Sequence, residues 1–252
     1  MSDKLSWFKR NNVNLDISNA CTLRCYKCSR EKYHLRKEKV RGHVMTDEEW
    51  QKYLKHFHRF WFSGQLSDPL MHPRFPQILQ DIWDSGKDAN VHNAASHRPQ
   101  HFYERCFKAH PRANWIFGID GLPKDSHKHR INQDGQKLFD MMLLSRKFLK
   151  VQPIWQYIIF SYNENDVDEA IDIAYKNGIQ LQILSSGRFN EGDPLKPSMH
   201  FKIRNPVNHS HVEKLKVNQL GEEKYNEIVP GMLLYKRAKR KTFCIKRVWN
   251  EQ

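Results

Sequence analysis

The sequence predicts an α/β protein built on a parallel sheet, and two observations support this fold class. Short apolar runs typical of buried strands occur six times along the chain, and amphipathic stretches typical of helices stand between them. This alternating order is typical of strands that run parallel, with helices packed outside the sheet. From about residue 194 the alternation stops, because Pro194, Pro197 and Pro206 interrupt a polar segment. We therefore predict one domain over residues 1–193 and a basic C-terminal extension over residues 194–252.

Each element has its own local signal. Strands are expected at residues 13–17, 60–62, 89–93, 115–122, 152–160 and 179–184. The first clear helix starts at Thr46, which forms a capping box with Glu49. Further helices are expected at residues 75–85, 97–109 and 136–150. A last helix follows the capping residue Asn163 and stops at Gly178.

Three cysteines stand directly after the first predicted strand. Cys21, Cys25 and Cys28 have the spacing C-x3-C-x2-C. Thiolates grouped in this way bind soft metals and iron–sulfur clusters. Three cysteines leave one iron of a four-iron cluster without a protein ligand, and an open metal position is typical of a catalytic site.

This motif resembles that of the radical S-adenosylmethionine (SAM) superfamily. The resemblance implies a [4Fe-4S] cluster held by Cys21, Cys25 and Cys28, with SAM bound to the open iron. It implies that an electron from the cluster cleaves SAM to a 5′-deoxyadenosyl radical, which abstracts hydrogen from a substrate. It also implies a partial (β/α)6 TIM-like barrel, which agrees with the six strands. One departure is Lys27, because the family often has an aromatic residue just before the last cysteine.

Further residues resemble the SAM site of this family. The stretch from Gly64 to Asp68 resembles a Gly-Gly-Glu-Pro-type motif that follows the second strand, in altered form. After the fourth strand, Gly118 stands where relatives often have Ser, and Arg130 resembles an Arg that pairs with the SAM carboxylate through two hydrogen bonds. The SAM-binding candidates implied by the resemblance are Gly64, Gln65, Asp68, Asp120 and Arg130. No catalytic acid or base for a substrate is identifiable.

Composition constrains the partners. There are 42 Lys and Arg against 28 Asp and Glu, which gives a net charge of +14 and favours anionic partners. The cations form no single stripe, so we prefer a solvated basic face to a nucleic-acid site, and an acidic electron donor also fits. Cys244 resembles the start of an auxiliary-cluster (SPASM-type) domain of peptide-modifying relatives, so we expect a peptide substrate rather than a nucleic acid. Clustered thiols, with no apolar run of membrane-span length, predict a cytoplasmic protein without a membrane partner.

Three alternatives stay open. The enzyme could act on a nucleoside or a nucleic acid, which only the charge favours. The chain could be a zinc-holding nucleic-acid-binding protein, with His34 or His43 as the fourth ligand. Because Gly118 and the stretch from Gly64 to Asp68 depart from the family pattern, it could also keep the cluster without SAM chemistry.

Overall fold

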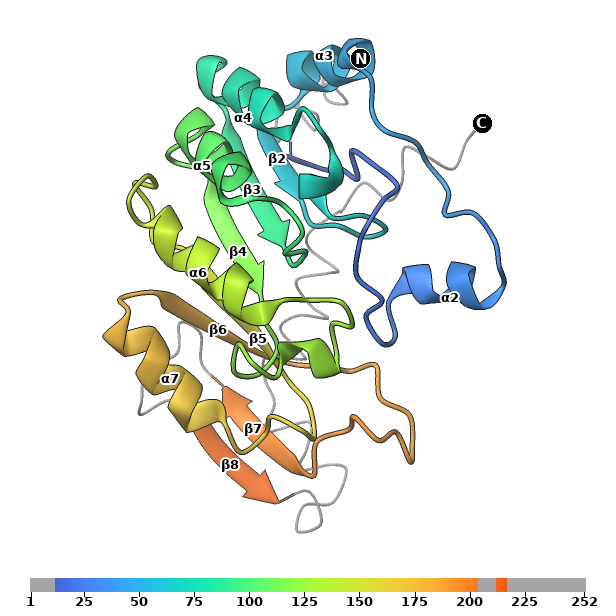
Figure 1. Ribbon diagram of the computed structural model, residues 1–252, viewed down its shortest axis with the longest axis vertical. Helices are drawn as coiled ribbons and strands as arrows, with labels where there is room; N and C mark the ends of the chain where they lie inside the picture. The colour runs from blue at the N-terminus through green and yellow to red at the C-terminus, as the bar shows by residue number, and fades with distance from the viewer. Residues whose placement is uncertain (1–11, 204–211, 217–252) are drawn as a thin grey trace, which may run out of the picture.

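Six parallel strands form one open sheet. The computed structural model describes residues 12–203 and 212–216. The strands are β1 (Asn12–Asn14), β2 (Arg59–Phe62), β3 (Asp88–Asn93), β4 (Asn114–Gly118), β5 (Ile154–Ile159) and β6 (Gln180–Ser185). They pair in sequence order, each parallel to the next. The predicted α/β fold is confirmed, and the open sheet is consistent with a partial TIM-like barrel (Figure 1).

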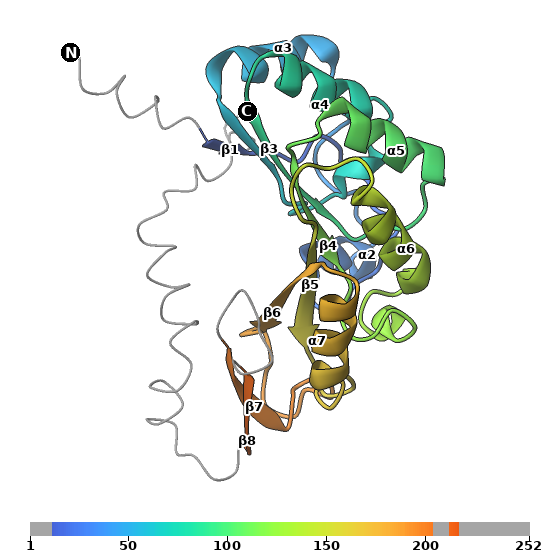
Figure 2. The same cartoon turned by 90° about the vertical axis from the view of Figure 1, so that its left-hand side faces the viewer.

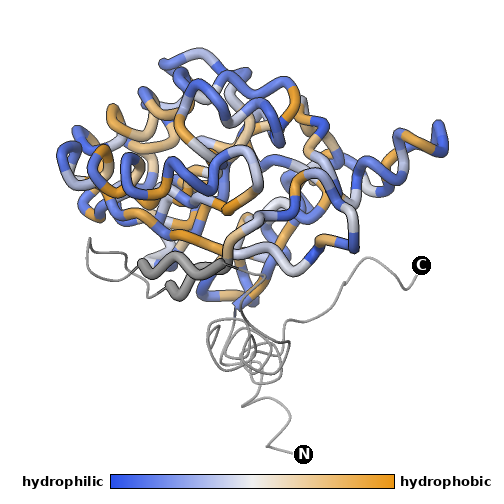
Figure 3. Tube along the Cα trace, turned by 90° about the horizontal axis from the view of Figure 1, so that it is seen from below, coloured by the Kyte–Doolittle hydropathy of each residue, from blue (hydrophilic) through white to orange (hydrophobic). Residues whose placement is uncertain are grey.

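The main helices cover one face of this sheet, as Figure 2 shows. They are α3 (Asp47–His56), α4 (Phe75–Asp84), α5 (Gln100–Ala109), α6 (Gly135–Ser145) and α7 (Val167–Lys176). Hydrophobic and hydrophilic residues alternate around them, as expected for helices with one buried face (Figure 3). The capping box at the start of α3 is confirmed, because the Glu49 N–H donates to Thr46 Oγ1 and Glu49 Oε2 accepts from the Thr46 N–H.

The core lies between the sheet and these helices. Strand side chains alternate between the two faces of the sheet, and those that face the helices are mostly large and aromatic. Phe60, Phe62, Trp115, Phe117, Trp155 and Tyr157 are all fully buried. The ring of Phe107 on α5 packs edge-on against Trp115, with centroids 4.8 Å apart. Burial of each such side chain contributes roughly 1.5–3 kcal/mol, so this layer holds the strand ends in place.

The other face of the sheet is more polar. Asn90 and His92 on β3 alternate with buried residues, as does Gln156 on β5. The Asn114 side chain donates to Asn90 Oδ1 at 3.1 Å, and Gln156 donates to Gln182 at 3.5 Å. The face away from the helices therefore carries amide side chains that link neighbouring strands.

His92 makes the stability of the chain depend on pH. Burial lowers the pKa of His92 to about 4, so the folded chain keeps this imidazole neutral where the unfolded chain protonates it. Below about pH 6.5 the unfolded state thus binds one more proton, and stability falls as the pH drops toward 4. In cluster-free His92→Gln, the slope of unfolding free energy against pH should fall by up to about 1.4 kcal/mol per pH unit across this range.

Denaturant unfolding between pH 4 and 6.5 measures this slope. The matched control is His127→Gln, which removes an exposed imidazole and should leave the slope unchanged. Equal slopes in wild type and His92→Gln would contradict the prediction.

Several elements differ from the prediction. The chain forms an unexpected helix α2 (Ser29–Leu35), which lies apart from the helical layer in Figure 1. An antiparallel hairpin, β7 (Met199–Ile203) and β8 (Val212–Lys216), occurs in the predicted extension. Cys106 on α5 is buried. Cys244 lies outside the described residues.

Within the described ranges, no helix is both long and apolar enough to span a membrane.

Candidate active site

The cysteine loop is held against the segment that follows β4. The N–H groups of Arg24 and Tyr26 donate to the carbonyls of Ile131 and His129, at 3.1 and 3.2 Å. Because the strands are parallel, the loops after β1 and β4 lie at the same edge of the sheet. This edge is where barrels of this kind place their chemistry.

The three thiols are free and only partly exposed. Burial and the nearby Asp68 carboxylate raise the pKa of Cys21 to about 12. Burial also raises the pKa of Cys25, although the Arg130 guanidinium opposes this rise. A bound metal supplies the positive charge that keeps such thiolates ionised. The donor set therefore fits a group that coordinates several thiolates at once.

A site for a single metal ion needs several ligating side chains close together. Among residues 12–203 and 212–216, no three His, Cys, Asp or Glu side chains converge so as to hold one metal ion. In a cubane cluster each thiolate binds a different iron, so the thiolates need not meet at one point. His34 and His43, the candidate zinc ligands, are exposed, and His43 Nε2 lies 2.9 Å from the Glu49 carboxylate.

Gly64 shapes the turn that follows β2. Its φ is +59°, and a Cβ at this position would lie 2.2 Å from the carbonyl oxygen of Ser67. Only glycine fits such a close approach of two backbone segments. The Asp16 carboxylate accepts the N–H groups of Leu66 and Ser67, at 3.1–3.2 Å, and so fixes the same turn. Gln65 is exposed within it.

Asp68 connects the ends of β2 and β3. Its buried carboxylate accepts the N–H groups of Leu70 at 3.0 Å and of Ala94 and Ala95, both at 2.9 Å. The Asn93 side chain donates to both Asp68 oxygens at 3.1 and 3.2 Å. The Asp68 carboxylate thus accepts hydrogen bonds from donors of the chain itself. These bonds hold the turn after β2 against the loop after β3. Its predicted contact with SAM stays a prediction.

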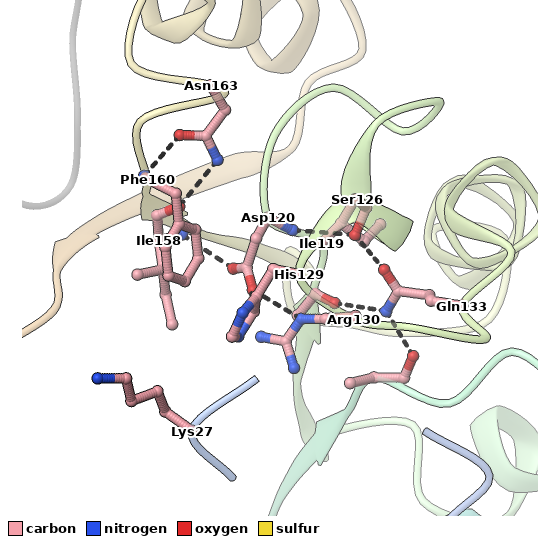
Figure 4. A network of polar contacts seen from close by, with 12 residues as sticks. Lys27, Ile119, Asp120, Ser126, His129, Arg130, Gln133, Ile158, Phe160 and Asn163 are labelled. Carbon is pink, nitrogen blue, oxygen red and sulfur yellow. Dashed lines mark hydrogen bonds and ion pairs between the residues drawn. The ribbon is translucent and has the colours of Figure 1, made fainter. Parts of the chain in front are cut away.

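Asp120 and Arg130 bind each other (Figure 4). Asp120 is fully buried, its Oδ1 accepts the Ile158 N–H at 3.0 Å, and its Oδ2 lies 2.8 Å from Arg130 Nε. The Tyr162 hydroxyl donates to the Asp120 carbonyl at 2.8 Å. The pair therefore ties the loop after β4 to β5 at the same edge as the cysteines.

Two side chains in this network differ from the sequence prediction. His129 stands in a polar run of the sequence, yet it is buried, and the centroid of its ring lies 4.2 Å from that of Phe160. Asn163, expected to cap α7, instead accepts the Phe160 N–H and donates to the Ile158 carbonyl, while Asp166 precedes α7. Asn163 therefore shapes the turn after β5.

A clasp formed by Lys27, Arg188 and Asp193 links the two ends of the sheet. Lys27 Nζ lies 2.6 Å from Asp193 Oδ2, and Arg188 Nη1 donates to the Lys27 carbonyl at 3.5 Å. Lys27 is in the cysteine loop after β1, whereas Arg188 and Asp193 follow β6. This contact was not predictable from the sequence, because salt bridges between distant loops leave no periodic pattern.

Comparisons with known proteins identify the fold. No protein-family model and no curated protein matches the sequence. The structure of Streptococcus suis SuiB bound to the precursor peptide SuiA matches with a TM-score of 0.58 and 10% identity, over 93% of this chain and 49% of SuiB. SuiB bound to S-adenosylmethionine matches with a TM-score of 0.57 and 10% identity, over 77% of this chain and 46% of that one.

The structure of a second enzyme also matches this fold. Methylornithine synthase (PylB) matches with a TM-score of 0.53 and 13% identity, over 73% of this chain and 55% of PylB. The chain thus spans about half the length of these proteins. Both belong to the radical SAM enzymes. The resemblance found in the cysteine motif is thereby confirmed at the level of the fold: this chain has the fold of the radical SAM superfamily.

Proposed function

We propose that this protein is a radical SAM enzyme, in which Cys21, Cys25 and Cys28 hold a [4Fe-4S] cluster. One observation carries the proposal: three free, partly buried thiols share a single loop at the carboxyl edge of an open parallel sheet. When cluster and SAM are bound, they supply a 5′-deoxyadenosyl radical upon reduction, which abstracts hydrogen from the substrate. The reaction requires a reducing electron donor as partner.

The remaining residues of the edge would hold SAM in place. Gly64 lets the backbone after β2 turn tightly, and Gln65 is exposed in this turn, where it would contact SAM. The Asp68 N–H donates to the Ala20 carbonyl at 3.1 Å, which holds the turn against the start of the cysteine loop. Asp68 keeps that turn fixed through the loop after β3. The Asp120–Arg130 pair lies on the opposite side of the cysteine loop. Together they would give SAM a set of fixed contacts that needs little reorganisation.

We propose a peptide or protein side chain as the substrate. SuiB, which shares this fold, is bound to a precursor peptide in one of its structures. The polar sheet face offers the amides of Asn90, Asn114, Gln156 and Gln182, which can donate to and accept from peptide groups. A nucleic-acid substrate has only the net charge in its favour.

Anaerobic reconstitution tests the proposed function. The wild-type chain should take up iron and sulfide, and after reduction with SAM it should form 5′-deoxyadenosine. Cys25→Ala should lose both properties, because one cluster ligand is gone. Cys106→Ala is the matched control, since this cysteine is buried in α5 away from the loop and should keep both.

Other outcomes separate the alternatives. Stoichiometric zinc without sulfide in the wild-type chain would overturn the proposal in favour of a zinc protein. Iron and sulfide uptake without 5′-deoxyadenosine would indicate a cluster without SAM chemistry.

A further inference from the structure

Arg130 is placed between two acidic groups, the Asp120 carboxylate and the Cys25 thiol. Its Nε pairs with Asp120 Oδ2 at 2.8 Å, and its side chain is only 13% exposed. The segment of Cys25 lies against that of Arg130, because the Arg24 and Tyr26 N–H groups donate to the Ile131 and His129 carbonyls at 3.1 and 3.2 Å. The guanidinium is close enough to the Cys25 thiol to oppose the rise in its pKa that burial causes. A guanidinium carries five N–H donors in a planar fork, so one edge can hold a carboxylate while another faces a sulfur.

Gly118 provides the space for this arrangement. A Cβ on Gly118 would lie 2.8 Å from Arg130 Nη2 and 3.0 Å from its Cζ. The guanidinium therefore lies directly over the last residue of β4, where any side chain would displace it. The sequence departs from the family resemblance at this same position, where relatives often have Ser. The position of the Arg130 guanidinium thus depends on the absence of a side chain at Gly118.

The orientation of Arg130 is fixed from several directions. Its backbone N–H donates to the Ser126 carbonyl at 3.0 Å, and its carbonyl accepts the Gln133 N–H at 2.8 Å. Gln133 in turn donates to the Gly118 carbonyl at 2.9 Å. Because backbone and side chain are both held, little freedom remains for the guanidinium to turn toward a different ligand.

We propose that Arg130 is a positioning residue for Cys25: it holds this thiolate as a cluster ligand and raises the reduction potential of the cluster, instead of binding the SAM carboxylate. This inference rests on the proposed function, because it concerns the cluster that the three cysteines hold. A positive charge and an N–H donor beside a ligand sulfur favour the reduced, more negative cluster. Removal of the cation should make the cluster harder to reduce.

The test is a redox titration followed by electron paramagnetic resonance, on reconstituted protein without SAM. For Arg130→Gln we expect at least a tenfold lower ratio of reduced to oxidised cluster at a given potential, a shift of about 59 mV to lower potential. Arg130→Lys keeps the charge and should restore most of the difference. Gly118→Ser keeps Arg130 but displaces the guanidinium, and should shift the potential in the same direction as Arg130→Gln.

SAM binding decides between the two roles. An unchanged reduction potential in Arg130→Gln, together with a tenfold or greater loss of SAM affinity, would overturn the inference. Arg130 would then be a ligand of the SAM carboxylate. If Arg130→Gln does not fold, Gly118→Ser carries the test, and a wild-type potential in that variant would overturn the inference. A wild-type chain that takes up no iron would instead refute the proposed function itself.

Discussion

Replacement of Asp120 by alanine is expected to lower the free energy of unfolding by about 3–5 kcal/mol. The carboxylate is fully buried and pairs with Arg130 Nε at 2.8 Å, so its removal leaves a guanidinium charge in the interior without its partner. The Ile158 N–H loses its acceptor as well. A domain of ordinary stability, about 5–15 kcal/mol, would lose a large part of its margin. Denaturant unfolding of the cluster-free chain measures the change.

The same loop supplies a matched control for Asp120→Ala. Asp125 also pairs with a cation at 2.8 Å, but its partner Lys128 is about half exposed. Asp125→Ala should therefore cost about 1 kcal/mol or less. Asp120→Ala combined with Arg130→Met should recover part of the loss, because no charge is left buried. Equal losses for the two single variants would contradict this account of the network.

Gly64→Ala is expected to lower the free energy of unfolding by about 3–5 kcal/mol and to weaken SAM binding. The residue has a left-handed φ of +59°, which costs an alanine energy by itself. In addition, the new methyl group would lie 2.2 Å from the Ser67 carbonyl oxygen, so the turn must open. Opening it separates the Asp16 carboxylate from its two N–H donors. Unfolding and SAM titration of the reconstituted protein measure the two effects.

Gly86→Ala distinguishes backbone strain from the steric clash. Gly86 has a similar φ of +66°, but nothing lies within 4 Å of the position that its Cβ would occupy. We expect a cost of only about 1–2 kcal/mol and unchanged SAM binding. A Gly64→Ala variant no less stable than Gly86→Ala would show that the turn tolerates a side chain.

The sequence predicted the sheet well, because its strands carry large apolar residues on every second position. Phe60, Phe62, Trp115 and Trp155 mark these strands, and all four are fully buried. The first strand is shorter than predicted, at Asn12–Asn14, although Leu15 and Ile17 beyond it are also buried. Burial alone therefore does not distinguish a strand from an extended loop that packs on the same core.

The candidate site was less predictable, because its polar contacts join segments far apart in the sequence. Asn163 was read as a helix cap from its local neighbours, yet its side chain binds backbone groups at the end of β5. His129 stands in a polar run, which is typical of an exposed side chain, yet Phe160 packs against its ring. Both outcomes depend on which loops meet at the edge of the sheet, and local patterns do not encode this.

The clasp between Lys27 and the segment after β6 also joins the two edge strands of the sheet. Strands β1 and β6 are not paired with each other in the described sheet, so the ring of loops is completed by the Lys27–Asp193 contact rather than by a continuous hydrogen-bonded wall. Side-chain contacts break and re-form far more readily than a strand ladder does. Loss of the Lys27–Asp193 ion pair would therefore separate the loops after β1 and β6 without breaking a single backbone hydrogen bond of the sheet.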